Sequence, residues 1–210
     1  EITLSEEDAV REAGRCLNCG ICSECMECVK ACEAHAIDHF MTDERITLDA
    51  GAIIVTPGVG LFDANVKAEY GYDRYDNVIT SIQFERILST SGPTKGEILR
   101  PSDGKEPQKI AWLQCIGSRD AHIGARNYCS SICCTQAIKE AMLAKEHSKD
   151  HPLDTAIFYM DIRTHGKDFE RYFNRGKDES GIRFIKSKIT NIIPVGDNGK
   201  QLIRYINQTG

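Results

Sequence analysis

Six cysteines crowd into residues 16–32, and this crowding constrains the chain more than any other feature of its sequence. They are Cys16, Cys19, Cys22, Cys25, Cys28 and Cys32. Disulfides explain them poorly, because C-x-x-C pairs would close loops too small to stabilise a fold. Zinc sites separate two C-x2-C pairs by a dozen or more residues, and this run is too crowded for that pattern. The crowding therefore favours an iron–sulfur cluster, with zinc as the alternative.

The last four of these cysteines, from Cys22 to Cys32, have the spacing C-x2-C-x2-C-x3-C. Bacterial ferredoxins hold a 4Fe-4S cluster with this run, because closely spaced thiolates reach different irons of one cube. Two such clusters would need eight thiolates. The six cysteines therefore predict at least one cluster, either with two spare thiols or with a second cluster that residues elsewhere complete.

Four further cysteines flank and follow a loop in the second half of the chain: Cys115, Cys129, Cys133 and Cys134. The sequence predicts a strand over 109–115 and a helix over 133–147, so these thiols should converge where the strand ends and the helix begins. A dinucleotide-binding turn would carry G-x-G-x-x-G here, and that motif is absent. A helix N-terminus favours negative charge, and a thiolate-ligated cluster is anionic. We expect a second 4Fe-4S cluster at this point, with buried core thiols as the alternative.

Strand and helix patterns alternate through the rest of the second half. We expect a strand over 155–162, a helix over 167–176 closed by Gly176, a strand within 181–195, and a hairpin that this segment forms with 200–207. This order predicts an α/β fold with a Rossmann-like, doubly wound parallel sheet. The cysteine-rich segment before it is expected to be ferredoxin-like.

The first half of the chain predicts fewer elements. We expect a helix over 5–15 and a helix over 80–92 that begins with a capping box of Thr80 and Gln83. The apolar, β-branched run at 52–56, ended by Pro57 and Gly58, predicts a buried strand.

Three regions follow from these patterns. Residues 1–45 form an iron–sulfur-binding segment, 46–108 a linking region, and 109–210 an α/β domain with the second cluster site. The boundary at 93–108 is rich in proline, glycine and charge. Because the chain begins with Glu1 rather than methionine, we expect it to be a piece of a longer protein.

Composition excludes two classes of function. A net charge of −5 argues against a nucleic-acid-binding protein, which needs a concentrated basic face. No run of eighteen apolar residues is present, so we expect no membrane span.

Several polar residues could contact a cluster or a nucleotide, and each also has a simpler structural explanation. His35 and His39 could adjust or ligate a cluster, although the cysteines suffice. Arg119 and Asp120 are placed to contact the second cluster site. Asp161 stands where a ribose-binding acid would lie, but without the glycine motif a salt bridge to Arg163 is the better prediction.

Several stretches resemble the A subunit of heterodisulfide reductase and its relatives. The resemblance covers about residues 46–188 and rests on "GAIIVTPGVGLFD", "YGYDRYDNVITSIQFERIL", "SGPTKGEILRPSDGKEPQKIAWLQCIGSRD", "YCSSICCTQAIKEAMLAKEH" and "IFYMDIRTHGKDFERYF". Its most specific part is the arrangement C…GSRD…YCS…CC. The stretch "EAGRCLNCG" resembles the iron–sulfur leader of flavoproteins like the small subunit of glutamate synthase.

The resemblance implies a thioredoxin-reductase-type flavoprotein, an oxidoreductase with FAD and several 4Fe-4S clusters. It makes residues 46–108 part of an FAD-domain-like region with a linker, and residues 109–210 a degenerate NAD-domain-like domain. It implies electron transfer, in some members flavin-based bifurcation, inside a cytoplasmic complex with other redox subunits and with ferredoxin-, hydrogenase- or dehydrogenase-type donors. By resemblance, Cys115, Cys129, Cys133 and Cys134 would ligate the cluster near the flavin. Ala52, Thr56, Pro57 and Gly58 would lie beside FAD, whose glycine motif would precede Glu1 in the full-length protein. The competing function is a non-redox, zinc-binding interaction module.

Overall fold

The structure is a computed structural model that describes residues 4–14, 26–121, 124, 126–148, 151–196 and 199–206. The chain divides into two compact units. Unit 1 comprises Glu1–Asn18 and Phe62–Gly210, and unit 2 comprises Cys19–Leu61. Cys16, Cys19, Cys22 and Cys25 lie outside the described residues, so their predicted ligation stays a prediction.

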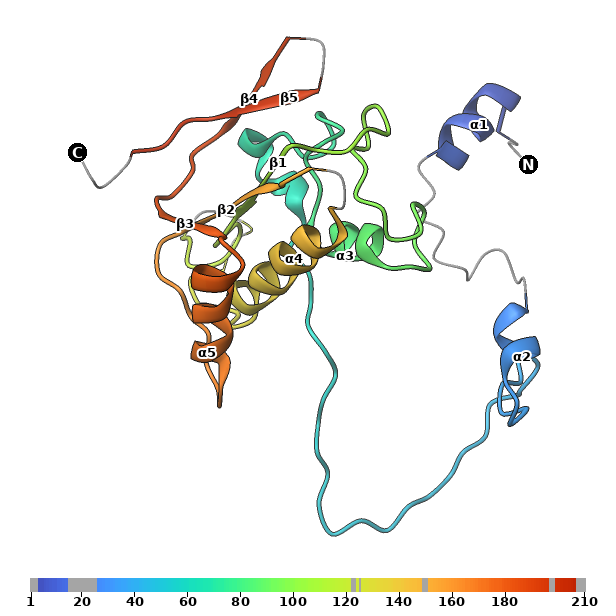
Figure 1. Ribbon diagram of the computed structural model, residues 1–210. Coiled ribbons are helices and arrows are strands. Elements are labelled where there is room, and N and C mark those ends of the chain that lie inside the picture. The colour runs from blue at the N-terminus through green and yellow to red at the C-terminus, as the bar shows by residue number, and fades with distance from the viewer. Residues whose placement is uncertain are drawn as a thin grey trace. The chain divides into compact units, whose positions relative to one another are not determined.

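Unit 1 is built around a three-stranded parallel sheet (Figure 1). Its strands, in the order β1-β2-β3, are Lys109–Leu113, Asp154–Tyr159 and Arg183–Lys186. The connection from β1 to β2 contains helix α4, Cys133–His147, and the connection from β2 to β3 contains α5, Phe169–Asn174. The predicted α/β class and parallel sheet are confirmed.

Alternation along the strands gives the sheet two apolar faces. Trp112 and Ile157 share a core cluster with α4 and with α3, Ser81–Leu88. Ala156 and Phe158 point the other way, because successive side chains of a strand face opposite sides. Burial of both faces explains why these strands read as continuous apolar runs.

The second face is covered by short elements. The 3₁₀ turn η3, Ala68–Tyr70, and the antiparallel hairpin of β4, Ile192–Val195, and β5, Lys200–Ile203, supply its neighbours. The Tyr70 hydroxyl donates a hydrogen bond to the backbone oxygen of Ile189, 2.8 Å away. The predicted hairpin is confirmed. Among the described residues, the hairpin and η3 take the place of the second helical layer that a doubly wound sheet would have.

The helix ends follow local chemistry. At the start of α3, Thr80 accepts a hydrogen bond from the Gln83 backbone N–H while the Gln83 side chain accepts one from the Thr80 N–H, which confirms the capping box. Gly176 does not close α5 as predicted, because the chain continues through a π-helical turn, Arg175–Glu179. A Cβ at Gly176 would lie 3.0 Å from Ile138, so glycine lets this turn pack against α4.

The first two helices of the chain are short, and they belong to different units. Helix α1, Glu6–Gly14, begins after Ser5, whose hydroxyl accepts a hydrogen bond from the Asp8 backbone N–H at 3.2 Å. Helix α2, Glu27–Ala31, lies in unit 2 and carries Cys28. The 3₁₀ turn η2, Ala64–Val66, opens the second stretch of unit 1.

None of the helices in the described ranges is long and apolar enough to cross a membrane.

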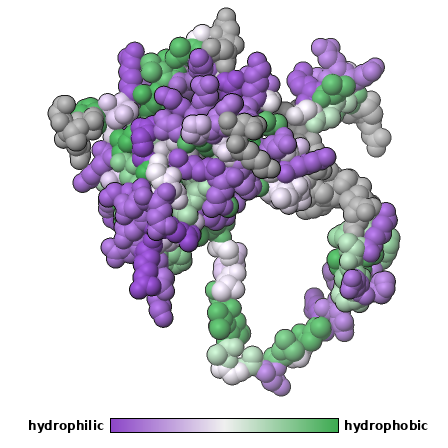
Figure 2. Space-filling view, viewed as in Figure 1, coloured by the Kyte–Doolittle hydropathy of each residue, from purple (hydrophilic) through white to green (hydrophobic). Residues whose placement is uncertain are grey.

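The buried strand predicted at 52–56 is wrong for this structure. Residues 41–61 of unit 2 are extended and unpaired, and Ile53, Ile54 and Val55 are about four-fifths exposed, at 83%, 87% and 78%. Figure 2 shows this extended segment with its apolar side chains uncovered. A strand needs a hydrogen-bonded neighbour, and no strand among the described residues pairs with this segment.

A buried carboxylate ties the helical layer of unit 1 to the sheet. Glu140 of α4 is fully buried and accepts hydrogen bonds from Ser81 of α3, from Trp112 Nε1 of β1 at 2.7 Å, and from Gln136 at 3.0 Å. Burial raises the pKa of Glu140, against these three hydrogen bonds, which lower it. Desolvation outweighs the hydrogen bonds, so folding shifts Glu140 toward its protonated form relative to the unfolded chain.

The substitution Glu140→Gln tests this balance. A raised folded-state pKa gives stability that is full below the unfolded pKa, about 4.3, and is lost as pH rises through the folded pKa. The stability of the wild-type chain relative to E140Q should therefore fall as pH rises above the unfolded pKa and through the raised folded-state pKa. Urea unfolding followed by the fluorescence of Trp112, the single tryptophan, measures it. The exposed Glu146→Gln on the same helix is the control, and a pH-independent difference for E140Q would contradict the expectation.

Candidate metal centre

Cys115 lies where the chain leaves the sheet. The Gln114 backbone N–H still pairs with the Phe158 oxygen at 3.0 Å, one residue beyond β1. Cys115 then adopts a left-handed conformation, φ 62°, which is uncommon for a residue other than glycine. The turn leaves the Cys115 thiol buried at the carboxyl end of β1.

The loop after Cys115 folds back on itself. Gly117 has φ 75°, and a Cβ there would overlap the ring of Phe62, so this turn requires glycine. The Gly117 oxygen accepts from the Arg126 N–H at 2.8 Å, and the Arg119 N–H donates to the Tyr128 oxygen at 3.1 Å. These bonds return the chain to Cys129, next to the point where the loop began.

The beginning of α4 brings in the last two thiols. Cys133 and Cys134 are the first residues of this helix, and the Cys134 Sγ lies 4.0 Å from the Asp161 backbone oxygen. Ile132 at the N-cap provides no side-chain hydrogen bond to the helix. The first N–H groups of α4 therefore lack a side-chain cap at the point where two thiols stand, and a helix dipole there favours an anion.

The pKa values of the thiols show that they interact. Hydrogen bonding from Cys134 lowers the pKa of Cys133 to about 6, against burial and with help from Ser130 and the backbone. The same interaction, together with burial, raises the pKa of Cys134. Burial and the charge of Cys133 raise the pKa of Cys115, against Arg119, and Cys129 raises it further. The structure thus brings together the four cysteines that the sequence predicted to converge.

This donor set suits a multi-iron cluster. All six cysteines among the described residues are free thiols, including these four. In the described part of the chain, no group of three His, Cys, Asp or Glu side chains is arranged so that it could hold a metal ion. Each thiolate of a cubane binds a different iron, so its ligands stand farther apart than the ligands of a tetrahedral zinc ion. Four free thiols in one place are a donor set that 4Fe-4S clusters and zinc sites both use.

Arg119 and Asp120 have separate partners at this site. The Arg119 guanidinium pairs with Asp161, which also accepts from Arg163 at 3.3 Å, so the predicted Asp161–Arg163 bridge is confirmed. Asp120 pairs instead with Lys67 at 2.7 Å, and both side chains are nearly buried. The sequence did not predict either ion pair. Lys67 and Asp120 are 53 residues apart, and Arg119 and Asp161 are 42 residues apart, so neither pair leaves a local sequence pattern.

Unit 2 holds the described end of the first cysteine run. Cys28 and Cys32 are one helical turn apart around α2, and the Cys28 Sγ lies 3.5 Å from His39 Nε2. The Ala36 backbone N–H donates to the Cys32 Sγ at 3.4 Å. His39, one of the two histidines considered from sequence, contacts the Cys28 thiol through its ring.

The residues expected beside FAD lie in the extended segment of unit 2. Ala52, Thr56, Pro57 and Gly58 are exposed, and Gly58 has φ 83°. They have no regular secondary structure, so their proposed contact with FAD stays a prediction.

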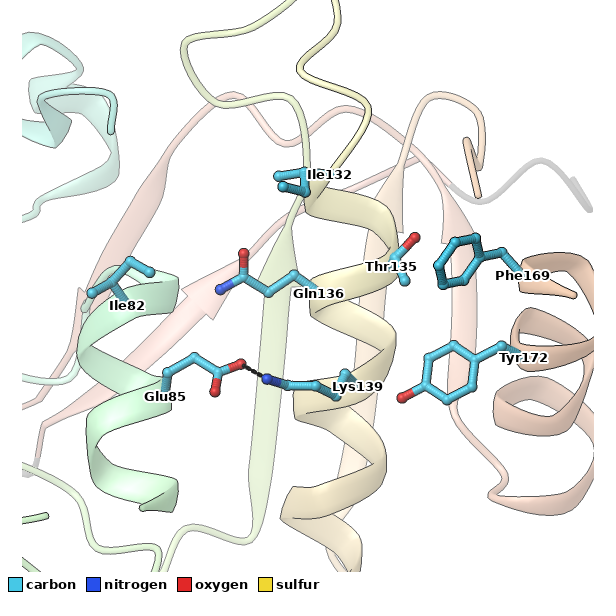
Figure 3. Close-up of a pocket in the computed structure, with 8 residues that line it drawn as sticks. All are labelled: Ile82, Glu85, Ile132, Thr135, Gln136, Lys139, Phe169 and Tyr172. Atoms are coloured by element: carbon cyan, nitrogen blue, oxygen red, sulfur yellow. Dashed lines mark ion pairs between the residues drawn. The ribbon is translucent and has the colours of Figure 1, made fainter. Parts of the chain in front are cut away.

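A surface groove in unit 1 has no cysteine in its lining. It has a volume of about 630 Å³ between α3, α4 and α5 (Figure 3). Its lining is Ile82, Glu85, Ile132, Thr135, Gln136, Lys139, Phe169 and Tyr172. Glu85 and Lys139 form an ion pair of 2.6 Å across it. No cysteine lines the groove, so it is not the candidate metal centre.

Comparison with known proteins decides the relationship of the chain. It is 42% identical over 90% of its length to the iron–sulfur A subunit of the CoB–CoM heterodisulfide reductase of Methanocaldococcus jannaschii. It is also 42% identical over 91% of its length to the A subunit of the ferredoxin/F420H2-dependent CoB–CoM heterodisulfide reductase of Methanosarcina acetivorans. The chain is homologous to the A subunits of heterodisulfide reductase.

The homology covers part of each relative. The chain spans 27% and 23% of these two proteins, about a quarter of their length. A third A subunit, from the H2:CoB–CoM heterodisulfide, ferredoxin reductase of Methanothermobacter marburgensis, is 42% identical over 78% of the chain and 24% of that protein. No family model matches the chain. The resemblance stated from the sequence motifs is confirmed at the level of homology to these subunits.

The Lys67–Asp120 pair should stabilise the loop between Cys115 and Cys129. Lys67→Met removes the ammonium group that lies 2.7 Å from the nearly buried Asp120 carboxylate, and losing one partner of a buried pair costs roughly 3 kcal/mol. Urea unfolding of K67M, read by Trp112 fluorescence, should show this loss. Lys109→Met is the control, because Lys109 is 79% exposed and 4.0 Å from Asp154, a geometry worth about 0.5 kcal/mol or less. Equal costs for the two variants would contradict a structural role for Lys67.

Proposed function

We propose that the chain is an electron-transfer portion of an iron–sulfur flavoprotein similar to the A subunit of heterodisulfide reductase. One observation carries the proposal: thiols from a strand end, a loop and a helix start meet beside the uncapped N-terminus of α4. In this proposal Cys115, Cys129, Cys133 and Cys134 ligate one 4Fe-4S cluster.

The residues around the thiols serve such a site in three ways. Burial of Cys115 and Cys134 limits water access to the site. The Ser131 backbone N–H, 3.3 Å from the Cys129 Sγ, and the N–H groups at the start of α4 donate toward negative sulfur. The low pKa of Cys133, caused first by Cys134, keeps a thiolate available near neutral pH. A bound cluster would supply one-electron transfer.

The first cysteine run is proposed to hold at least one further cluster. Cys22, Cys25, Cys28 and Cys32 have the ferredoxin spacing, and Cys16 and Cys19 precede them. The His39 ring lies 3.5 Å from the Cys28 Sγ, and in this proposal it hydrogen-bonds to that sulfur when Cys28 ligates the cluster.

We propose that the longer protein also binds FAD. The segment with Ala52, Thr56, Pro57 and Gly58 would complete a flavin-binding, Rossmann-like domain of the thioredoxin-reductase type there. Its exposed apolar side chains suit a segment that packs against further protein. The relatives are named as subunits of heterodisulfide reductases that use ferredoxin or H2, so we propose redox subunits and such donors as partners.

Anaerobic purification and reconstitution with iron and sulfide tests the proposal. The chain should show broad visible absorbance that dithionite bleaches, with iron and acid-labile sulfide in similar amounts. A colourless protein with stoichiometric zinc would instead indicate the non-redox zinc module.

Single cysteine replacements test the second site. Cys133→Ser or Cys134→Ser should remove about four irons per chain, one cluster's worth, because the cube loses a corner ligand. Thr135→Ser, on the same helical turn, is the matched control and should keep all the iron. Iron analysis and visible spectra measure the iron content and the cluster absorbance of each variant. Full iron content in both cysteine variants would mean that Cys133 and Cys134 are core thiols.

A further inference from the structure

The chain that follows α2 folds back toward the two cysteines at this helix of unit 2. Cys28 lies in the helix, and Cys32 is its C-cap residue, about one helical turn later. The His35 backbone N–H donates to the Cys32 oxygen at 3.0 Å, and His35 has φ 48°, a left-handed conformation that suits a turn. This turn directs residues 36–39 back toward α2.

Each of the two sulfurs meets one nitrogen of this returning segment. The Ala36 backbone N–H donates to the Cys32 Sγ at 3.4 Å. The His39 Nε2 lies 3.5 Å from the Cys28 Sγ. Ala36 meets the later cysteine and His39 the earlier one, as expected for a segment that has reversed its direction.

The distance between His39 and Cys28 fits a hydrogen bond. Each protein ligand of a cubane binds a different iron, so two ligands of one cube stand farther apart than two ligands of one ion. A nitrogen 3.5 Å from the Cys28 Sγ is within reach of that sulfur and too close to it to serve a second iron of the same cube. With Cys28 as a ligand, His39 therefore donates to the sulfur, in the tautomer that carries hydrogen on Nε2.

The two donors depend on sequence in different ways. Every residue other than proline has the backbone N–H that Ala36 supplies, so the contact with Cys32 does not require a particular side chain. The contact with Cys28 requires the ring of His39. Cys28 and His39 are both exposed, so water competes for the sulfur and the expected effect of this hydrogen bond is modest.

Resting on the proposed function, we propose that His39 is a positioning residue that raises the reduction potential of the cluster bound by Cys28. Reduction adds one electron to a thiolate-ligated site that is already negative, and the Nε2 proton stays on the ring. An N–H group directed at the sulfur stabilises the form with the extra electron more than the oxidised form, and hydrogen bonds to the sulfurs help to set cluster potentials. In the test, dithionite supplies the electron.

A redox titration of the reconstituted chain, followed by visible absorbance and electron paramagnetic resonance, measures the effect. Cys133→Ser together with Cys134→Ser removes two ligands proposed for the other site, so the remaining signal belongs to the first cysteine run. In this background His39→Leu should favour the oxidised form about threefold, a shift of about 28 mV to lower potential at about 59 mV per tenfold. His39→Gln keeps an N–H donor of similar reach and should return most of the shift. The same His39 variants are also titrated without the two serine substitutions.

A matched control and a second readout isolate the hydrogen bond. His35→Asn should leave the potential unchanged, because His35 stands on the same turn and asparagine tolerates its left-handed conformation. Exchange of the chain into D2O should shift the iron–sulfur stretching bands in the resonance Raman spectrum. This shift should be smaller in H39L than in the wild type and H39Q.

The outcomes separate this inference from the proposed function. Absence of iron from the wild-type chain after reconstitution would overturn the proposed function itself. Full iron content with an unchanged potential in H39L would overturn this inference alone. Loss of iron in H39L would also overturn it, because His39 would then be a ligand rather than a donor to Cys28. Equal shifts in H39L and H39Q would show that the N–H donor is not what raises the potential.

Discussion

The parallel pairing of β1 with β2 is the constraint on which the candidate site depends. The register places Leu113 beside Phe158, and the Gln114 N–H extends the pairing by one more bond. Parallel strands end at the same edge of a sheet, so Cys115 and Asp161 emerge close together. Helix α4 begins at that edge because it connects the two strands, which brings Cys133 and Cys134 there as well.

Much of unit 1 could be predicted from sequence, because its signals are local. The apolar runs of β1 and β2, the start of α4 at Cys133 and the capping box of α3 each depend on residues a few positions apart. The strand predicted at 52–56 failed for the opposite reason. An apolar β-branched run becomes a strand only when another segment supplies hydrogen bonds, and that information is not in the run itself.

The grouping of the four thiols was predictable from the sequence, and the pairing of the charged side chains near them was not. Cysteine is rare enough that Cys115, Cys129 and the Cys133–Cys134 pair point to one another once the strand and the helix are recognised. Arginine and aspartate are common, so their pairing depends on tertiary contacts. Arg119 meets Asp161 across 42 residues, and Asp120, its neighbour in sequence, turns to Lys67 instead. Neighbouring charges thus take opposite roles, one at the thiols and one in the core.

Two sources of positive potential act on the thiols from different elements. The uncapped start of α4 supplies partial charge from backbone N–H groups, which falls off within the first turn. Arg119, in the loop after Cys115, and Arg163, beyond the end of β2, carry full positive charges and both pair with Asp161. Cys133, in the helix, is influenced first by its neighbour Cys134, whereas Cys115, at the strand end, has Arg119 to offset its burial. Burial outweighs these charges at Cys115 and Cys134, whose pKa values are raised, whereas the pKa of Cys133 is lowered.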